Sequence, residues 1–86
     1  MKYVFYEDPG HGWLKVPLKE LEELGIADKI SAYSYMKGSH AYLEEDRDAP
    51  IFKKMMEAEG RTVELDVNFS NRSSRIRRYP GYKHPN

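Results

Sequence analysis

Two segments that begin at a proline and end at a glycine constrain the fold more than any other feature. They run from Pro17 to Gly25 and from Pro50 to Gly60. Proline is favoured at the first position of a helix, and glycine is favoured just after the last turn. Apolar residues recur at helical spacing inside both segments, at Leu18, Leu21 and Leu24 and at Ile51, Phe52, Met55 and Met56. The sequence therefore predicts two short helices.

The first helical segment follows a predicted hairpin. Residues 2–6 and 13–16 are rich in aromatic and β-branched side chains, which favour strands. The turn between them contains Asp8, Pro9 and Gly10, three residues with the backbone preferences that a tight turn needs.

Three further strands are predicted around the second helix. Residues 31–36 and 40–45 flank Gly38-Ser39, a two-residue hairpin signal. Asp48 is the expected N-cap of the second helix. Residues 62–69 alternate regularly, so we expect an inward row made of Val63, Leu65, Val67 and Phe69. The predicted order is ββαββαβ, an α+β fold with about five mainly antiparallel strands and two helices on one face.

The charges divide the chain into two parts, a single α+β domain over residues 1–70 and a basic C-terminal arm over residues 71–86. All fourteen acids lie in residues 1–70 with nine Lys or Arg, a net charge of −5. Residues 71–86 carry five Lys or Arg and no acid, a net charge of +5. Such an arm either attracts an anionic partner or folds back on the acidic domain.

Composition excludes several classes of site. The chain has no cysteine, which excludes disulfides, thiolate metal sites and a cysteine nucleophile. No apolar run approaches the ~18 residues of a membrane span, and no secretory signal is recognisable, so we expect a cytoplasmic protein. The spacing of the histidines matches no metal-binding motif. The acidic run over residues 44–48 indicates the end of a strand followed by a capped helix, with acids near the helix N-terminus. We therefore predict no cofactor, no metal and no catalytic residues.

The string DPGHGW, residues 8–13, is the first candidate binding site. Its glycines flank His11, and Trp13, the only tryptophan, follows. Histidine exchanges protons near neutral pH, and tryptophan is a favoured anchor of contact surfaces. The alternative is a hairpin turn with an exposed histidine and a tryptophan packed on the sheet. No phosphate-loop motif is present.

Two further groups of residues are candidate contacts for a partner. Tyr33 and Tyr35 share one face of their predicted strand, which is either an exposed aromatic surface or the core face. In the arm, arginines alternate with small polar residues and tyrosine, a combination that suits phosphates and stacked bases. The candidate residues of the arm are Arg72, Arg75, Arg77, Arg78 and Tyr79.

The strings DPGHGWLKVP, LGIADKIS, YSY and AYLEED resemble those of small proteins encoded in bacterial genomes, prophages and plasmids. The similarity runs from Tyr6 to about residue 78. That group has no assigned activity, so the resemblance implies a bacterial cytoplasm and a phage or other mobile-element context, with no catalytic residues. The preferred function is stoichiometric binding to a protein partner, with modulation of host defence or regulation as one role. The alternative is binding of single-stranded nucleic acid or RNA through the arm, and a homodimer is also compatible with the sequence.

Overall fold

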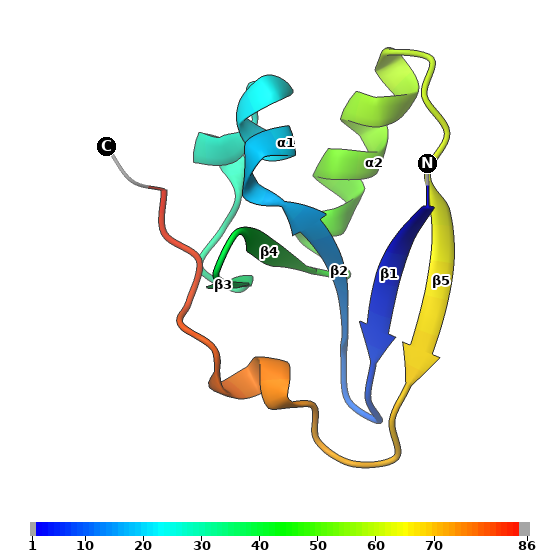
Figure 1. Cartoon of the computed structure of the whole chain (residues 1–86), viewed down its shortest axis with the longest axis vertical. Coiled ribbons are helices and arrows are strands. Elements are labelled where there is room, and N and C mark those ends of the chain that lie inside the picture. The colour runs from blue at the N-terminus through cyan, green and yellow to red at the C-terminus, as the bar shows by residue number, and fades with distance from the viewer. Residues whose placement is uncertain (1, 85–86) are drawn as a thin grey trace.

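The computed structural model describes residues 2–84, and its elements follow the predicted ββαββαβ order (Figure 1). The helices are α1 (Leu18–Glu23) and α2 (Ala49–Ala58), and short 3-10 turns η1 and η2 cover Ala27–Lys29 and Arg75–Arg78. The strands are β1 (Lys2–Glu7), β2 (Gly12–Pro17), β3 (Tyr35–Lys37), β4 (His40–Glu44) and β5 (Glu64–Phe69). The α+β class predicted from the sequence is confirmed.

The five strands form one sheet in the order β3-β4-β2-β1-β5. Only the β1–β5 pair is parallel; the other pairs are antiparallel. Leu14 lies opposite both Phe5 and Leu43, so these side chains share one face of the sheet. Leu21 of α1 and Phe52 of α2 pack in the same core and are fully buried. Both helices therefore cover one face, as predicted.

The helices end where the glycines predict. Gly25 and Gly60 have φ angles of +72° and +71°, a backbone conformation that most L-residues avoid. After Gly25 the chain turns back, and the N–H of Ile26 donates to the carbonyl of Leu21 at 3.0 Å. Ile26 is 1% exposed, so the end of α1 is closed by an apolar contact as well as a hydrogen bond.

The predicted strand over residues 31–36 exists but was placed too early, because regular pairing begins only at Tyr35 and ends at Lys37. Asp48 precedes α2, yet its side chain makes no capping hydrogen bond to that helix. Its carboxylate instead accepts the Ser31 N–H at 3.1 Å and hydroxyl at 2.7 Å, and the hydroxyl of Ser34. These bonds hold residues 31–34 as a loop against the start of α2. Within this loop Tyr33 is 60% exposed.

The expected burial of the row that includes β5 was wrong for three of its four residues, whereas Val63, just before β5, is partly buried against the main core. Leu65, Val67 and Phe69 do lie on the side of the sheet that carries the helices, because they pair with Tyr3, Phe5 and Glu7 of β1. They are nevertheless 42%, 55% and 56% exposed. β5 is one of the two edge strands, and neither helix extends over it (Figure 1).

Residues 71–84 are the described part of the arm. Ile76 and Tyr79 pack on the opposite face of the sheet, and from Pro80 the arm runs along the free edge of β3 to Tyr82, which is buried in the main core. In Figure 1 this segment, orange to red, runs from β5 below the β1–β2 turn and then past β3. Ile76 is 2% exposed and packs with Trp13 and Tyr42 in a second apolar cluster. The carbonyl of Pro80 accepts the N–H of Met36 at 2.9 Å, which ties the arm to β3. Among residues 2–84, no helix is long and apolar enough to cross a membrane.

Candidate functional site

Asp8 is the residue of DPGHGW that makes the most polar contacts. One carboxylate oxygen accepts the backbone N–H groups of Gly10 and His11 at 3.0 Å each. The other accepts the N–H of Ser74 at 2.8 Å. The guanidinium of Arg77 donates to both oxygens, through Nε and Nη2, at 2.8 Å each. Asp8, which is 3% exposed, therefore holds the turn and the arm together.

These contacts stabilise the charged form of Asp8. The hydrogen bonds from Arg77, together with those from the N–H groups of Ser74, His11 and Gly10, hold the pKa of the Asp8 carboxyl far below its usual range, although burial acts in the opposite direction. Asp8 in turn raises the pKa of Arg77, chiefly through the hydrogen bonds that Arg77 donates to it. The Asp8–Arg77 ion pair joins the β1–β2 turn to the arm, so the guanidinium of Arg77 is already bound to Asp8.

Five of the predicted binding residues line one cavity of about 600 Å³. Its lining comprises His11, Trp13, Tyr33, Tyr35 and Arg77 with Glu44, Asp46 and Arg47. The guanidinium of Arg47 lies 4.0 Å from the centre of the Tyr33 ring, and that of Arg77 lies 5.3 Å from the Trp13 ring. The cavity has aromatic walls with acidic and basic groups, an arrangement that suits a small polar ligand with an apolar part.

Trp13 contributes a buried wall rather than an exposed anchor. It is 2% exposed, with the rings of Tyr35 and His11 at centroid distances of 6.3 and 6.2 Å. The alternative in which this tryptophan packs on the sheet therefore describes the structure. His11 is an exposed residue of the turn, as that alternative also states.

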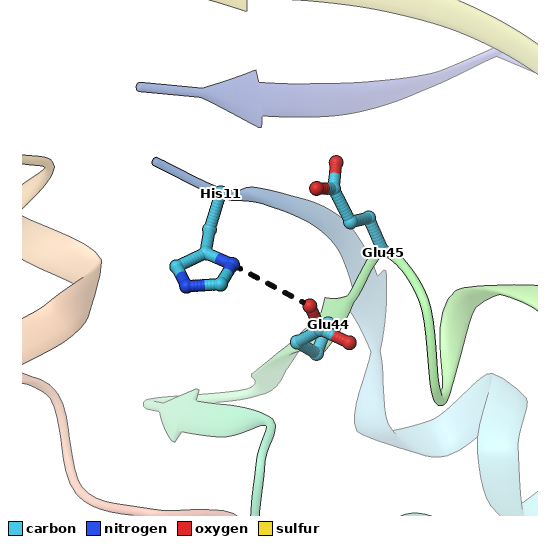
Figure 2. A group of neighbouring side chains, drawn as sticks. All are labelled: His11, Glu44 and Glu45. Carbon is cyan, nitrogen blue, oxygen red and sulfur yellow. Dashed lines mark ion pairs between the residues drawn. The ribbon is translucent and has the colours of Figure 1, made fainter. Parts of the chain in front are cut away.

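His11 faces two glutamates at the end of β4. Its Nδ1 lies 3.7 Å from Oε2 of Glu44, and Glu45 lies beside them (Figure 2). Each of the three side chains has one possible ligand atom within 4.8 Å of the others. Glu44 and Glu45 were read from the sequence only as the end of a strand, because their distance from His11 along the chain conceals the contact.

The other predicted arm residues line a separate, basic cavity of about 630 Å³. Arg72, Arg75, Arg78 and Tyr79 are joined there by Lys15 from β2. Within residues 2–84, none of these four cations forms an ion pair, whereas Arg77 does. The arm thus folds back on the domain, yet only one of its arginines pairs with an acid.

The apolar row of β5 is a surface that the sequence did not predict. Leu65, Val67 and Phe69 are consecutive on one side of the strand, and with Tyr33 they are the large hydrophobic residues most exposed in the described chain. A cavity of about 600 Å³ lies beside them, lined by Phe5, Leu65 and residues of α2 that include Ile51.

No protein-family model, curated protein sequence or solved structure matches this chain. The function is therefore inferred from the residues and their geometry.

Proposed function

We propose that the protein acts by stoichiometric binding to a protein partner, and that an extended segment of the partner pairs with β5. The observation that carries this proposal is the exposed row of Leu65, Val67 and Phe69 on the edge strand β5. Within the described residues β5 pairs only with β1, so its other edge offers backbone donors and acceptors to an added strand.

The β5 edge lacks several of the features with which monomeric proteins protect outer strands, although Glu64 and Asp66 place two charges on the side of β5 away from the apolar row. Such edges commonly carry lysine, proline or a bulge. The sequence of β5, ELDVNF, has neither lysine nor proline, and its register with β1 is continuous from Glu64 to Phe69. An added strand would therefore meet a regular edge and a row of apolar side chains on one side.

The cavity between β5 and α2 supplies a place for side chains of that segment. Phe5, Leu65 and Ile51 give it apolar walls, and Lys53 and Lys54 also line it. In strand addition, backbone pairing supplies affinity and pockets for alternate side chains supply specificity. The expected ligand is thus an extended segment with an apolar residue at every second position.

The proposed setting is a bacterial cytoplasm, as an accessory protein of a phage or another mobile element. This part of the proposal rests on the strings that begin with DPGHGWLKVP. Modulation of host defence or regulation would be one role for such a binding protein.

Capture from nuclease-treated bacterial lysate tests the proposal. We expect the wild-type chain to retain a discrete protein that Val67→Lys releases, because a charge replaces the centre of the apolar row. Ala32→Lys adds the same charge to an exposed residue of the 31–34 loop and should retain the protein. Equal capture by wild type and Val67→Lys contradicts the proposal, as does a protein that is lost on nuclease treatment.

A second candidate function, binding of single-stranded nucleic acid or RNA, is supported by the basic cavity of the arm. Lys15, Arg72, Arg75 and Arg78 line it without acidic partners in the described chain, and Tyr79 offers a ring for stacking. Arginine pairs with phosphates, and tyrosine stacks on bases of any sequence.

The salt dependence of oligonucleotide binding tests this second function. With four phosphate contacts, the slope of log K against log salt for a labelled oligouridine should be about −3. Arg75→Ala should reduce the magnitude of this slope by about 0.7. Lys53→Ala, which removes a cation from the cavity between β5 and α2, should leave the slope unchanged. Binding that is independent of salt, or equally affected by both variants, contradicts this function.

A further inference from the structure

Three side chains that carry metal-binding atoms meet at one end of the sheet. His11 precedes β2, Glu44 ends β4, and Glu45 follows it (Figure 2). Donor atoms of a tetrahedral ion with bond lengths of ~2.0–2.2 Å lie about 3.4 Å apart. Nδ1 of His11 and Oε2 of Glu44 are already 3.7 Å apart, and the three possible ligand atoms lie within 4.8 Å of one another. Small rotations of the Glu45 side chain would complete the set.

Other hydrogen bonds orient the side chain of Glu44 and hold the backbone of His11. Oε1 of Glu44 accepts the backbone N–H groups of Asp46 and Arg47 at 2.9 Å each, which leaves Oε2 directed at His11. The backbone of His11 is held by Asp8, which accepts its N–H at 3.0 Å. Supporting hydrogen bonds of this kind fix the direction of a metal ligand and raise affinity.

The carboxylate of Glu45 lacks a cationic partner. No hydrogen bond or ion pair of this side chain is found within residues 2–84. Asp46, Glu44 and Glu7 place negative charge near this carboxylate, and His11 lies near it as well. A bound cation would offset this local excess of negative charge.

Gly12 leaves the space that Glu45 occupies. A Cβ built at Gly12 would lie 2.7 Å from a carboxylate oxygen of Glu45 and would also collide with the ring of Phe5. The close approach of Glu45 to the residue next to His11 thus depends on the absence of a side chain there.

We propose that His11, Glu44 and Glu45 bind a divalent transition-metal ion of the Zn²⁺ and Ni²⁺ class. One imidazole nitrogen and two carboxylate oxygens suit these ions, whereas Mg²⁺ and Ca²⁺ prefer oxygen ligands alone. The side chain of His11 is 51% exposed. His11 and Glu44 are part of the wall of the aromatic cavity of about 600 Å³ that Trp13 also lines. Positions of the ion that face this cavity are open to water or to a small ligand.

The single tryptophan reports on this site. The rings of His11 and Trp13 lie 6.2 Å apart, so paramagnetic Ni²⁺ bound at His11 should quench the fluorescence of Trp13. We expect saturable quenching of the full chain that EDTA reverses, that Zn²⁺ displaces and that Mg²⁺ does not displace.

Three variants separate the proposed site from accidental binding. His11→Ala should weaken Ni²⁺ binding by at least about tenfold, because even the loss of a supporting residue commonly costs about 10- to 100-fold. Glu45→Gln, which keeps the shape of the side chain, should also weaken it. His84→Ala is the matched control and should bind as the wild type does, because His84 lies 3.4 Å from Glu22 and no third ligand stands near them among residues 2–84.

Urea unfolding curves of each variant establish that the fold is retained. Equal quenching of wild type and His11→Ala would overturn the proposal. It would also be overturned if Glu45→Gln binds as the wild type does, since a lone histidine would then explain the binding. A loss in His84→Ala as large as in His11→Ala would have the same consequence.

Discussion

At the scale of the residue, Asp8 connects the β1–β2 turn to the arm. Its carboxylate accepts from Gly10, His11, Ser74 and Arg77, and the last two lie 66 and 69 residues further along the chain. A buried carboxylate with this many donors stabilises a structure only while it stays charged and every donor is in place. Two predictions follow from this chemistry.

Replacing Asp8 with asparagine should release the arm. An amide has only one accepting oxygen, so its NH2 group must face the N–H donors either of Gly10 and His11 or of Ser74 and Arg77. We expect a loss of about 2–3 kcal/mol in the free energy of unfolding, below the loss for a fully buried pair because Arg77 is partly exposed. Urea denaturation measures the loss, and amide exchange at Ile76 reports the arm. Asp66→Asn, at an exposed acid of β5, is the control, and equal stability of the two variants would contradict the assignment.

Acid should weaken the same link. The folded-state pKa of Asp8 is lowered, so its contribution to stability is fully present above the unfolded-state pKa of about 3.9 and is lost as the pH falls below that value. Unfolding free energies measured from neutral pH down to pH ~2 should therefore fall more steeply for the wild type than for Asp8→Asn. Parallel curves would show that Asp8 carries no such linkage.

At the scale of the element, β5 differs from the strands that the helices cover. β2 and β4 contribute Leu14, Val16 and Leu43 to the core, each no more than 1% exposed. β5 has an equally regular alternation of apolar and polar residues, yet its apolar side remains open to solvent. Alternation therefore predicted the strand correctly and the burial wrongly, because burial depends on what lies above the strand.

Substitutions on the two kinds of surface should differ sharply in stability. Val67→Lys should change the free energy of unfolding by no more than about 0.5 kcal/mol, since the side chain is 55% exposed. Phe52→Ala should cost about 3–5 kcal/mol, since Phe52 is fully buried in the core between α2 and the sheet. Thermal or urea unfolding measures both values. A large cost for Val67→Lys would show that β5 is covered in solution.

At the scale of the whole molecule, the arm is the third layer of the structure. The helices cover one face of the sheet, and the part of the arm around Ile76 and Tyr79 covers part of the other before the chain passes the edge of β3 at Gly81. Trp13 and Tyr42 are 2% and 8% exposed beneath Ile76 and Tyr79. Tyr82 is 6% exposed and joins the main core, where its hydroxyl donates to the carbonyl of Ala27.

A chain that ends at Ser70 should expose this second cluster. The emission of Trp13 should shift to longer wavelength. The free energy of unfolding should fall by at least about 1.5–3 kcal/mol, because burial of Ile76 alone accounts for that much. Fluorescence and urea denaturation test both expectations. A chain that ends at His84 is the control, and unchanged emission after truncation at Ser70 would contradict the packing of the arm on the sheet.

The sequence by itself determined the local features of this protein. Prolines and glycines bound the helices, period-two alternation marks the strands, and the order of elements follows, because these signals act within a few residues. Tertiary structure alone decided which apolar rows are covered, that residues 31–34 bond to Asp48, that Arg77 pairs with Asp8, and that His11 faces Glu44 and Glu45. Each of these outcomes depends on contacts between residues distant along the chain, and no local pattern specifies such a partner.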